Sequence, residues 1–152
     1  MPRPTRLTPG RRALVTTVIA DTGALYALID RSDAWHERVR TWWERNRHPV
    51  IVPSSVLPEI CYLLQTRIGA HAELAFMRAV ASSEFAIESL DASDLARIPD
   101  VMHAYADLPL GFVDASVVAI GERLEVRDVL TTDRRHFGAV RPRHVQGFQL
   151  LP

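Results

Sequence analysis

The chain has 152 residues, of which 47% are hydrophobic and 24% charged, and its formal net charge is zero. These values predict one folded domain with a substantial core, and they do not indicate nucleic-acid binding through a strongly basic surface. All 18 basic residues are arginines, which excludes Schiff-base lysine chemistry and the lysine of a Walker-type phosphate loop. Zinc-type spacings of cysteine and histidine are also absent. The lone cysteine, Cys61, permits no intrachain disulfide and fits a reducing compartment such as the cytoplasm.

Residues 1–17 differ in composition from the rest of the chain, because they contain arginines and prolines but no acidic residue. The apolar run that follows is interrupted by Thr16 and Thr17, so it does not match a secretory signal. No apolar run reaches membrane-spanning length. We expect residues 1–17 to be a disordered basic tail or the result of a start codon assigned too early, rather than a nucleic-acid-binding arm. Residues 18–152 are then the folded domain.

The stretch VIADTGALYALID, residues 18–30, predicts a buried strand followed by a helix. The strand is expected at about residues 14–20, because the run is short and rich in Val, Ile and Thr. Asp21 then lies at the carboxyl end of a buried strand, which is where open α/β sheets bind ligands. The alternative is that Asp21 only caps the next helix, which is a common role for aspartate.

Strands and helices alternate along the rest of the chain, which predicts a mostly parallel sheet covered on both faces. The expected strands are Val50 to Val52, Phe85 to Ile87, Asp128 to Thr131, and a final one near residues 148–151. The expected helices are residues 34–48, one capped by Ser54 or Ser55 and running to about Arg67, residues 71–81, one starting at Asp91 or Ser93, and one starting at Asp114.

Three tryptophans lie on one face of the helix expected at residues 34–48. Trp35, Trp42 and Trp43 share that face with Val39 at helical spacing. Core packing explains such a face in most proteins. Because three tryptophans exceed what packing needs, we expect part of this surface to contact a partner chain.

Three further acids resemble Asp21 in their placement. Asp133 follows the strand expected at Asp128 to Thr131, Asp114 begins a helix, and Glu59 is expected on or beside the buried face of its helix. Glu59 could instead only complement the helix dipole, and the four acids could be unrelated. Because strand ends and helix starts share one edge of a parallel sheet, the four side chains could converge. Such carboxylates stay ionised only beside cations, and an all-oxygen site favours Mg²⁺ or Mn²⁺ and phosphodiester hydrolysis.

These segments resemble, in order and spacing, the motifs of PIN-domain ribonucleases of the VapC toxin type. The matching segments are VIADTGALYALID with Asp21, PSSVLPE with Glu59, GFVDA with Asp114, and LTTDRRHF with Asp133. The resemblance implies a three-layer α/β/α fold, Mg²⁺- or Mn²⁺-dependent cleavage of RNA, a cognate VapB-type antitoxin and a homodimer.

The resemblance also implies a role for each acid. Asp21 and Asp114 would be the firmest metal ligands, Glu59 would complete the site or orient the water, and Asp133 would act directly or through water. Thr131 would hold the site by hydrogen bonds, although a plain strand threonine explains it equally well.

Two other enzyme classes that place an aspartate after the first strand fit less well. Haloacid-dehalogenase-like phosphatases need an acid where this chain has Gly23, and both they and receiver domains need a lysine. A catalytically inactive PIN-like binding module remains an alternative. Arginines cluster after Asp133, where they either guide the RNA backbone or form a solvated surface; they are Arg134, Arg135, Arg141 and Arg143.

Overall fold

The computed structural model describes residues 16–152, so the expectations for the N-terminal tail fall almost entirely outside the described residues. The strands are β1 (Val18–Ala20), β2 (Val50–Pro53), β3 (Ala86–Glu88), β4 (Asp128–Leu130) and β5 (Gln149–Leu151). The helices are α1 (Thr22–Ile29), α2 (His36–Arg45), α3 (Val56–Arg67), α4 (Ala70–Ala81), α5 (Ala92–Ala104), α6 (Phe112–Leu124) and α7 (Arg134–Ala139).

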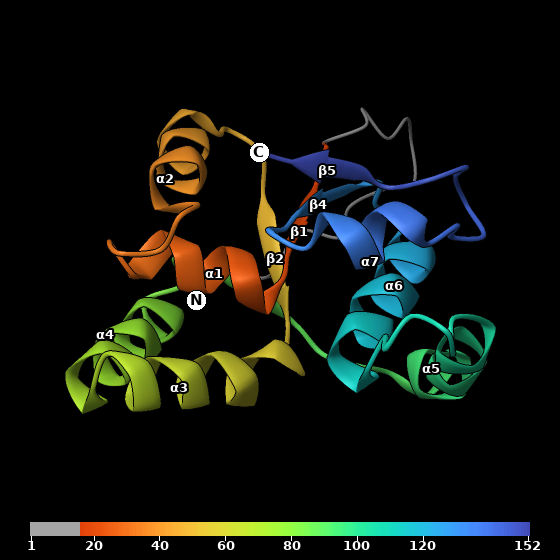
Figure 1. Cartoon of the computed structure of the whole chain (residues 1–152), viewed down its shortest axis with the longest axis horizontal. Coiled ribbons are helices and arrows are strands. Elements are labelled where there is room, and N and C mark those ends of the chain that lie inside the picture. Colours follow the sequence, from red (N-terminus) through yellow and green to blue (C-terminus); the bar gives the residue numbers. More distant parts are fainter. Residues whose placement is uncertain (1–15) are drawn as a thin grey trace, which may run out of the picture.

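The five strands form one parallel sheet in the order β3-β2-β1-β4-β5. Helices α1 to α4 lie on one side of this sheet and α5 to α7 on the other (Figure 1). The predicted three-layer α/β/α fold with a parallel central sheet is therefore confirmed. No helix within residues 16–152 is long and apolar enough to span a membrane.

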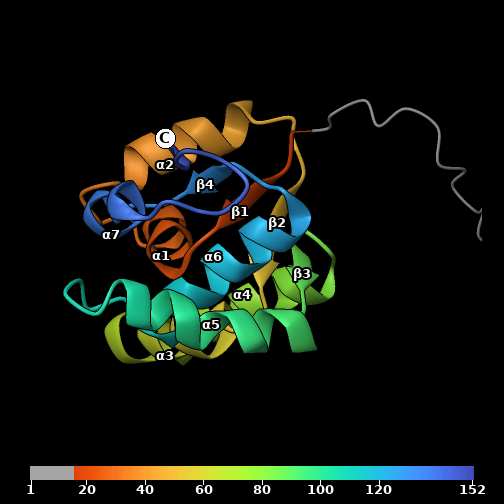
Figure 2. The same ribbon diagram turned by 90° about the vertical axis from the view of Figure 1, so that its right-hand side faces the viewer.

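The central strands are buried on both faces, which explains their continuous apolar sequence. All three residues of β1 are at most 1% exposed, and Val129 and Leu130 of β4 are fully buried. Helix α6 packs against the sheet with a run of small and β-branched residues from Ala115 to Gly121, all of them buried. Helix α5 lies across the outside of α6 (Figure 2).

One local expectation was correct only in part, and one helix was missed. Ser55 occupies the N-cap position of α3 as expected, but its side chain makes no capping hydrogen bond; its hydroxyl instead lies 2.5 Å from the Ser116 hydroxyl of α6. Helix α7 was not expected, because six residues with two arginines show no helical periodicity. Asp133 caps this short helix, so its start is fixed by the same side chain that ends the β4 segment.

Candidate active site

The site lies between β1 and β4, where the chain connections turn from one side of the sheet order to the other. The chain leaves β1 toward β2 on one side, whereas β4 is followed by β5 on the other. Asp21 directly follows β1, and Asp133 lies three residues after the end of β4. The first turns of α1, α6 and α7 converge on the same region (Figure 1). Ligands of doubly wound sheets bind at such a switch point.

Asp21 is both a helix cap and a site residue. Its side chain accepts a hydrogen bond from the Ala24 backbone N–H at 2.8 Å, which fixes the start of α1. Its other oxygen accepts a hydrogen bond from the Thr131 hydroxyl. The side chain is only 4% exposed. The capping interpretation of Asp21 is thus correct, and it does not exclude ligand binding, because the cap holds the carboxylate in place.

Thr131 links the two strand ends. Its hydroxyl donates to Asp21 and accepts from the Asp133 backbone N–H at 2.8 Å. Thr131 is fully buried. The expectation that this threonine holds the site by hydrogen bonds is confirmed.

Asp114 and Asp133 complete a compact acidic group. Asp114 is the third residue of α6, and its side chain is 29% exposed. Asp133 accepts a hydrogen bond from the His136 backbone N–H at 2.9 Å. Oxygens of these two aspartates and a ring nitrogen of His136 all lie within 4.8 Å of one another, close enough to share a metal ion.

Burial and mutual repulsion raise the pKa of two of these carboxyls. The pKa of Asp21 rises to about 7, mainly because the group is buried, with smaller contributions from the charges of Asp114 and Asp133. The pKa of Asp114 rises to about 6, mainly through burial and then through the charge of Asp133. Among the described residues, no arginine forms an ion pair with these three aspartates. The group therefore favours a bound cation.

Glu59 lies beside the buried face of α3, as one of the two expected placements had it, and its side chain is exposed. The buried stripe of α3 runs through Val56, Ile60 and Leu64, and Glu59 lies one position beside it. Its charge raises the pKa of Asp114, so it acts electrostatically on the site without belonging to the compact group. Glu59 is thus placed at the rim.

His136 was not singled out from the sequence. Its Nδ1 lies 2.6 Å from Asp133 Oδ2 and 4.0 Å from Asp114 Oδ2. The signal available was its spacing of three residues from Asp133, which brings two side chains together only if a helix begins there. Because α7 was not expected, that signal was missed.

Comparison with known proteins identifies the family. The model of the family described as PIN domain matches residues 18–141. Ribonuclease VapC26 from Mycobacterium tuberculosis (strain ATCC 25618 / H37Rv) is 33% identical over 135 residues, which are 89% of this chain and 100% of that protein. The chain is a VapC-type member of the PIN domain family.

Solved structures of VapC-type proteins share the fold. Mycobacterium tuberculosis VapC20, described as a sarcin-ricin loop cleaving toxin, superposes with a TM-score of 0.75 at 22% identity, over 80% of this chain and 94% of that chain. DNA-bound VapBC from Salmonella typhimurium superposes with a TM-score of 0.61 at 17% identity, over 88% of this chain and 96% of that chain.

The side chains of this VapC-type site fit a divalent metal ion. The donors are carboxylate oxygens, which such ions prefer, with one imidazole nearby. The pKa values of Asp21 and Asp114 are raised mainly by burial and by neighbouring carboxylates, and for Asp114 the charge of His136 offsets only part of this rise. A bound cation would supply further positive charge and lower both pKa values.

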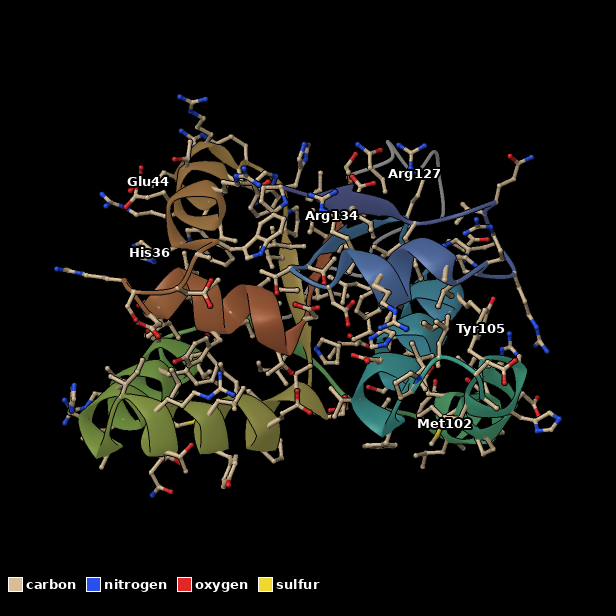
Figure 3. The ribbon with its side chains drawn as sticks, viewed as in Figure 1. His36, Glu44, Met102, Tyr105, Arg127 and Arg134 are labelled. Carbon is tan, nitrogen blue, oxygen red and sulfur yellow. The ribbon has the colours of Figure 1, made fainter. Side chains whose placement is uncertain are left out.

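The four arginines after Asp133 make different contacts. The Arg134 guanidinium lies 5.6 Å from the Trp35 ring centroid and donates to the Pro152 carbonyl, close to β5 (Figure 3). Arg141 donates to carbonyls of its own segment, and Arg143 borders a hollow of about 330 Å³ on the α5/α6 side. Arg135 is exposed, and its side chain has no hydrogen bond or ion pair to the described residues.

Proposed function

We propose that this VapC-type protein is an endoribonuclease toxin that cleaves RNA phosphodiesters with Mg²⁺ or Mn²⁺. The observation that carries the proposal is the group of three carboxylates, Asp21, Asp114 and Asp133, at the switch point of the sheet, where no arginine of residues 16–152 pairs with them. VapC26 from Mycobacterium tuberculosis, which is 33% identical to this chain, is named a ribonuclease. These findings support a nuclease over a catalytically inactive binding module, because a binding role alone does not require unneutralised carboxylates.

Each acid has a distinct part in this proposal. Asp114 and Asp133 offer oxygens to the ion, and Asp21 offers a carboxylate whose direction is fixed by Ala24 and Thr131. Glu59, at the exposed rim, completes the site or orients the attacking water. When bound, the ion lowers the pKa of a water ligand and neutralises charge on the phosphate.

Cleavage assays on RNA test the proposal. We expect the purified protein to cleave RNA in the presence of Mg²⁺ or Mn²⁺, and we expect EDTA to abolish this cleavage. Asp21→Asn and Asp114→Asn should each lower the rate by about 10³-fold or more, because each removes a charge that stabilises the ion. Asp107→Asn is the matched control, since Asp107 is an exposed acid near α6. Cleavage that continues in EDTA, or in both site variants, would exclude the metal mechanism.

Arg135 is the arginine that we propose guides the RNA backbone. It lies two residues after Asp133, is exposed and has no intramolecular partner within residues 16–152. Arg135→Ala should weaken RNA binding and reduce its salt dependence by about one phosphate contact. Arg143→Ala on the α5/α6 side is the control and should leave the salt dependence unchanged. Equal salt slopes for Arg135→Ala and the parent would contradict this role.

We further propose a VapB-type antitoxin as the protein partner. Complexes of VapBC type are among the structures with this fold, including those from Rickettsia felis and Salmonella typhimurium. On α2, both Trp42 and Trp43 are partly buried against the core, and Trp43 packs against Phe85 with ring centroids 5.4 Å apart. Trp42 borders a hollow together with Arg45 and Arg47. The partner surface around α2 and α3 is therefore expected to include Trp42 rather than Trp43.

A pair of variants tests this surface. Trp42→Ala should weaken antitoxin binding while RNA cleavage by the free protein persists, whereas Trp43→Ala should lower the melting temperature and activity together. Unchanged antitoxin affinity in Trp42→Ala would place the partner elsewhere.

We also propose a homodimer, because large apolar side chains are exposed on two helix pairs: Tyr62, Leu74 and Met77 on α3/α4, and Leu95, Met102 and Phe112 on α5/α6. Light scattering on Tyr62→Ser and Met102→Ser should show which helix pair mediates it. A monomeric parent protein at micromolar concentration would rule it out.

A further inference from the structure

His136 holds both oxygens of the Asp133 carboxylate. Its backbone N–H donates to Oδ1 at 2.9 Å, and its ring Nδ1 lies 2.6 Å from Oδ2. Two acceptors do not approach this closely without a proton between them. An ionised Asp133 therefore requires Nδ1 to be the donor. The carboxylate can neither rotate nor turn away while both bonds are present.

The other ring nitrogen of His136 has no role in the described fold. Nε2 is buried and has no hydrogen-bond partner among residues 16–152. Buried ring nitrogens of this kind are uncommon, because an unpaired polar atom costs free energy. The ring is thus placed for the contact made by Nδ1, at the cost of leaving Nε2 unpaired.

The His136–Asp133 contact is one end of a hydrogen-bond chain across the switch point. The Asp133 backbone N–H donates to Thr131, and the Thr131 hydroxyl donates to Asp21. His136 thereby connects the first turn of α7 to the end of β1. Its Nδ1 also lies 4.0 Å from Asp114 Oδ2, so it faces the carboxylate of α6 as well.

We infer that His136 is a positioning residue, which directs the Asp133 carboxylate toward the ion through the Nδ1–H hydrogen bond. The inference rests on the proposed metal-dependent function and adds a residue that acts through Asp133. Hydrogen bonds that orient metal-binding side chains change metal affinity or activity by about 10- to 100-fold when they are lost. The chemistry requires a donor at the position of Nδ1 and makes no use of Nε2.

Three substitutions separate the two ring nitrogens. An asparagine side chain can place its amide N–H near the position of Nδ1, whereas a glutamine amide reaches the position of Nε2. We expect His136→Ala and His136→Gln to weaken Mn²⁺ binding about 10-fold or more and to lower kcat/KM for RNA. His136→Asn should stay within about 3-fold of the parent in both. Mn²⁺ affinity is measured without RNA, by titration calorimetry or by the electron paramagnetic resonance signal of free Mn²⁺.

His144 provides the matched control. Its Nε2 contacts the Val126 carbonyl at 2.8 Å, and its buried Nδ1 has no partner in the described part of the chain. Like His136, His144 thus has one ring nitrogen in a hydrogen bond and one buried and unpaired, but it lines the hollow on the α5/α6 side instead of contacting Asp133. His144→Ala should lower the melting temperature without changing Mn²⁺ affinity, which separates loss of packing from loss of positioning.

The outcomes distinguish this inference from the proposed function. A parent protein that neither binds Mn²⁺ nor cleaves RNA would refute the proposed function itself. If the parent does both, His136→Ala with unchanged affinity and rate would overturn the positioning role. Equal losses in all three His136 variants would overturn it as well, because the ring would then bind the ion directly or only fill space. Rescue by glutamine instead of asparagine would assign the role to Nε2 and overturn it too.

Discussion

The two ends of helix α6 lie in two acidic groups, one without and one with arginine partners among the described residues. In the first turn, Asp114 lies beside Asp133 and Asp21 with no arginine partner in the described part of the chain, and the pKa of Asp114 rises to about 6. In the last turn, Arg123 donates to Asp94 at 3.0 Å and to Glu88 at 2.9 Å. One helix thus joins an unneutralised acidic group to an arginine-bound one.

Hydrogen bonds and ion pairs keep the carboxylates of the arginine-bound group charged. Arg97 contacts Glu122 at 2.8 Å, and the pKa of Glu122 is lowered by hydrogen bonds from Arg97 and the Arg143 backbone, despite its partial burial. Asp91 also has a lowered pKa, mainly through hydrogen bonds from Ser93 and the Asp94 backbone. These contacts tie α5 to α6 and extend to Glu88 in β3, so this group serves the fold.

The difference between the two groups indicates where function lies. The chain has 18 arginines, and folding uses two of them to neutralise the acids at one end of α6. Buried carboxylates without such partners cost stability. A protein that retains them at one site, at the switch point of its sheet, has them available for an ion or a reaction.

Removing Arg123 should produce the largest change in stability. Arg123→Ala leaves Asp94, which is 1% exposed, without its guanidinium. Loss of one partner of a buried pair costs about 3–5 kcal/mol, and we expect the lower end, because Arg123 is itself partly exposed. Urea unfolding measures the loss, and the exposed pair Arg40–Glu44 supplies the control variant Arg40→Ala, which should change little. A parental urea midpoint in Arg123→Ala would show that the arginine-bound group does not stabilise the fold.

Adding metal should stabilise the protein through the other end of α6. An ion that binds only the folded state contributes about 2.7 kcal/mol at 100 times its dissociation constant. We expect Mn²⁺ to raise the melting temperature of the parent and of Glu122→Gln, relative to EDTA, but not that of Asp114→Asn. If Asp114→Asn gains as much as the parent, the ion binds elsewhere.

The fold and the centre of the site followed from local patterns in the sequence. Short apolar runs ending in aspartate placed Asp21 and Asp133 at strand ends, and the parallel topology brought those ends together. The placement of Asp21 and Asp133 uses only strand period and the direction of neighbouring strands. Thr131, in contrast, was singled out through the resemblance to PIN-domain ribonucleases, which have a threonine two residues before the last aspartate.

Other features depend on contacts that no local pattern contains. Helical spacing placed Glu59 beside the buried stripe of α3, but its exposure depends on what packs against that position, and among residues 16–152 its side chain is exposed. His136 needed α7, whose six residues are too short to show a period. Arg134 and Arg135 are adjacent in sequence, yet only Arg134 reaches Trp35 and Pro152. The exposure of Glu59, the position of His136 and the contacts of Arg134 all depend on tertiary packing.

The two acidic groups should respond to pH in opposite directions. The pKa of Asp21 is about 7 in the folded protein against an ordinary 3.8, so the metal-free folded state binds the proton more tightly than the unfolded chain. The resulting stability is complete below about pH 3.8 and is lost as pH rises through about 7. The lowered pKa of Glu122 has the opposite sign, because its contribution is present above the ordinary value and is lost in acid.

The change in the free energy of unfolding between pH 5 and pH 8 therefore reports on the carboxyls of the site and not on the arginine-bound group. In EDTA, we expect the free energy of unfolding of the parent to fall by roughly 3–4 kcal/mol over this range, since Asp21 and Asp114 have folded-state pKa values of about 7 and about 6 and one pKa unit corresponds to about 1.4 kcal/mol. Asp21→Asn should flatten most of this dependence and be the more stable protein at pH 8, because its amide oxygen can still cap Ala24. Glu122→Gln is the control and should keep the parental slope. A parental slope in Asp21→Asn would show that Asp21 is not the titrating group.

The smallest effect should come from close packing beside the acidic group of the site, near the first turn of α6. A Cβ added to Gly23, in the first turn of α1, would lie 2.5 Å from the Thr132 hydroxyl oxygen, whereas a Cβ on Gly138 in α7 has 3.9 Å to its nearest neighbour. Alanine favours a helix over glycine by about 0.5–1 kcal/mol, so Gly138→Ala should be slightly more stable than the parent. Gly23→Ala must displace Thr132, which offsets that gain and moves the residue between Thr131 and Asp133.

Calorimetric Mn²⁺ titration and thermal unfolding of both glycine variants measure the difference. We expect Gly23→Ala to unfold within about 1 kcal/mol of the parent, because a threonine hydroxyl can rotate away, but to bind Mn²⁺ a few-fold more weakly. Gly138→Ala should bind as the parent does. Parental Mn²⁺ affinity in Gly23→Ala would show that the loop carrying Asp133 tolerates the displacement, and that the carboxylates hold their geometry through the Thr131 and His136 hydrogen bonds without close packing against α1.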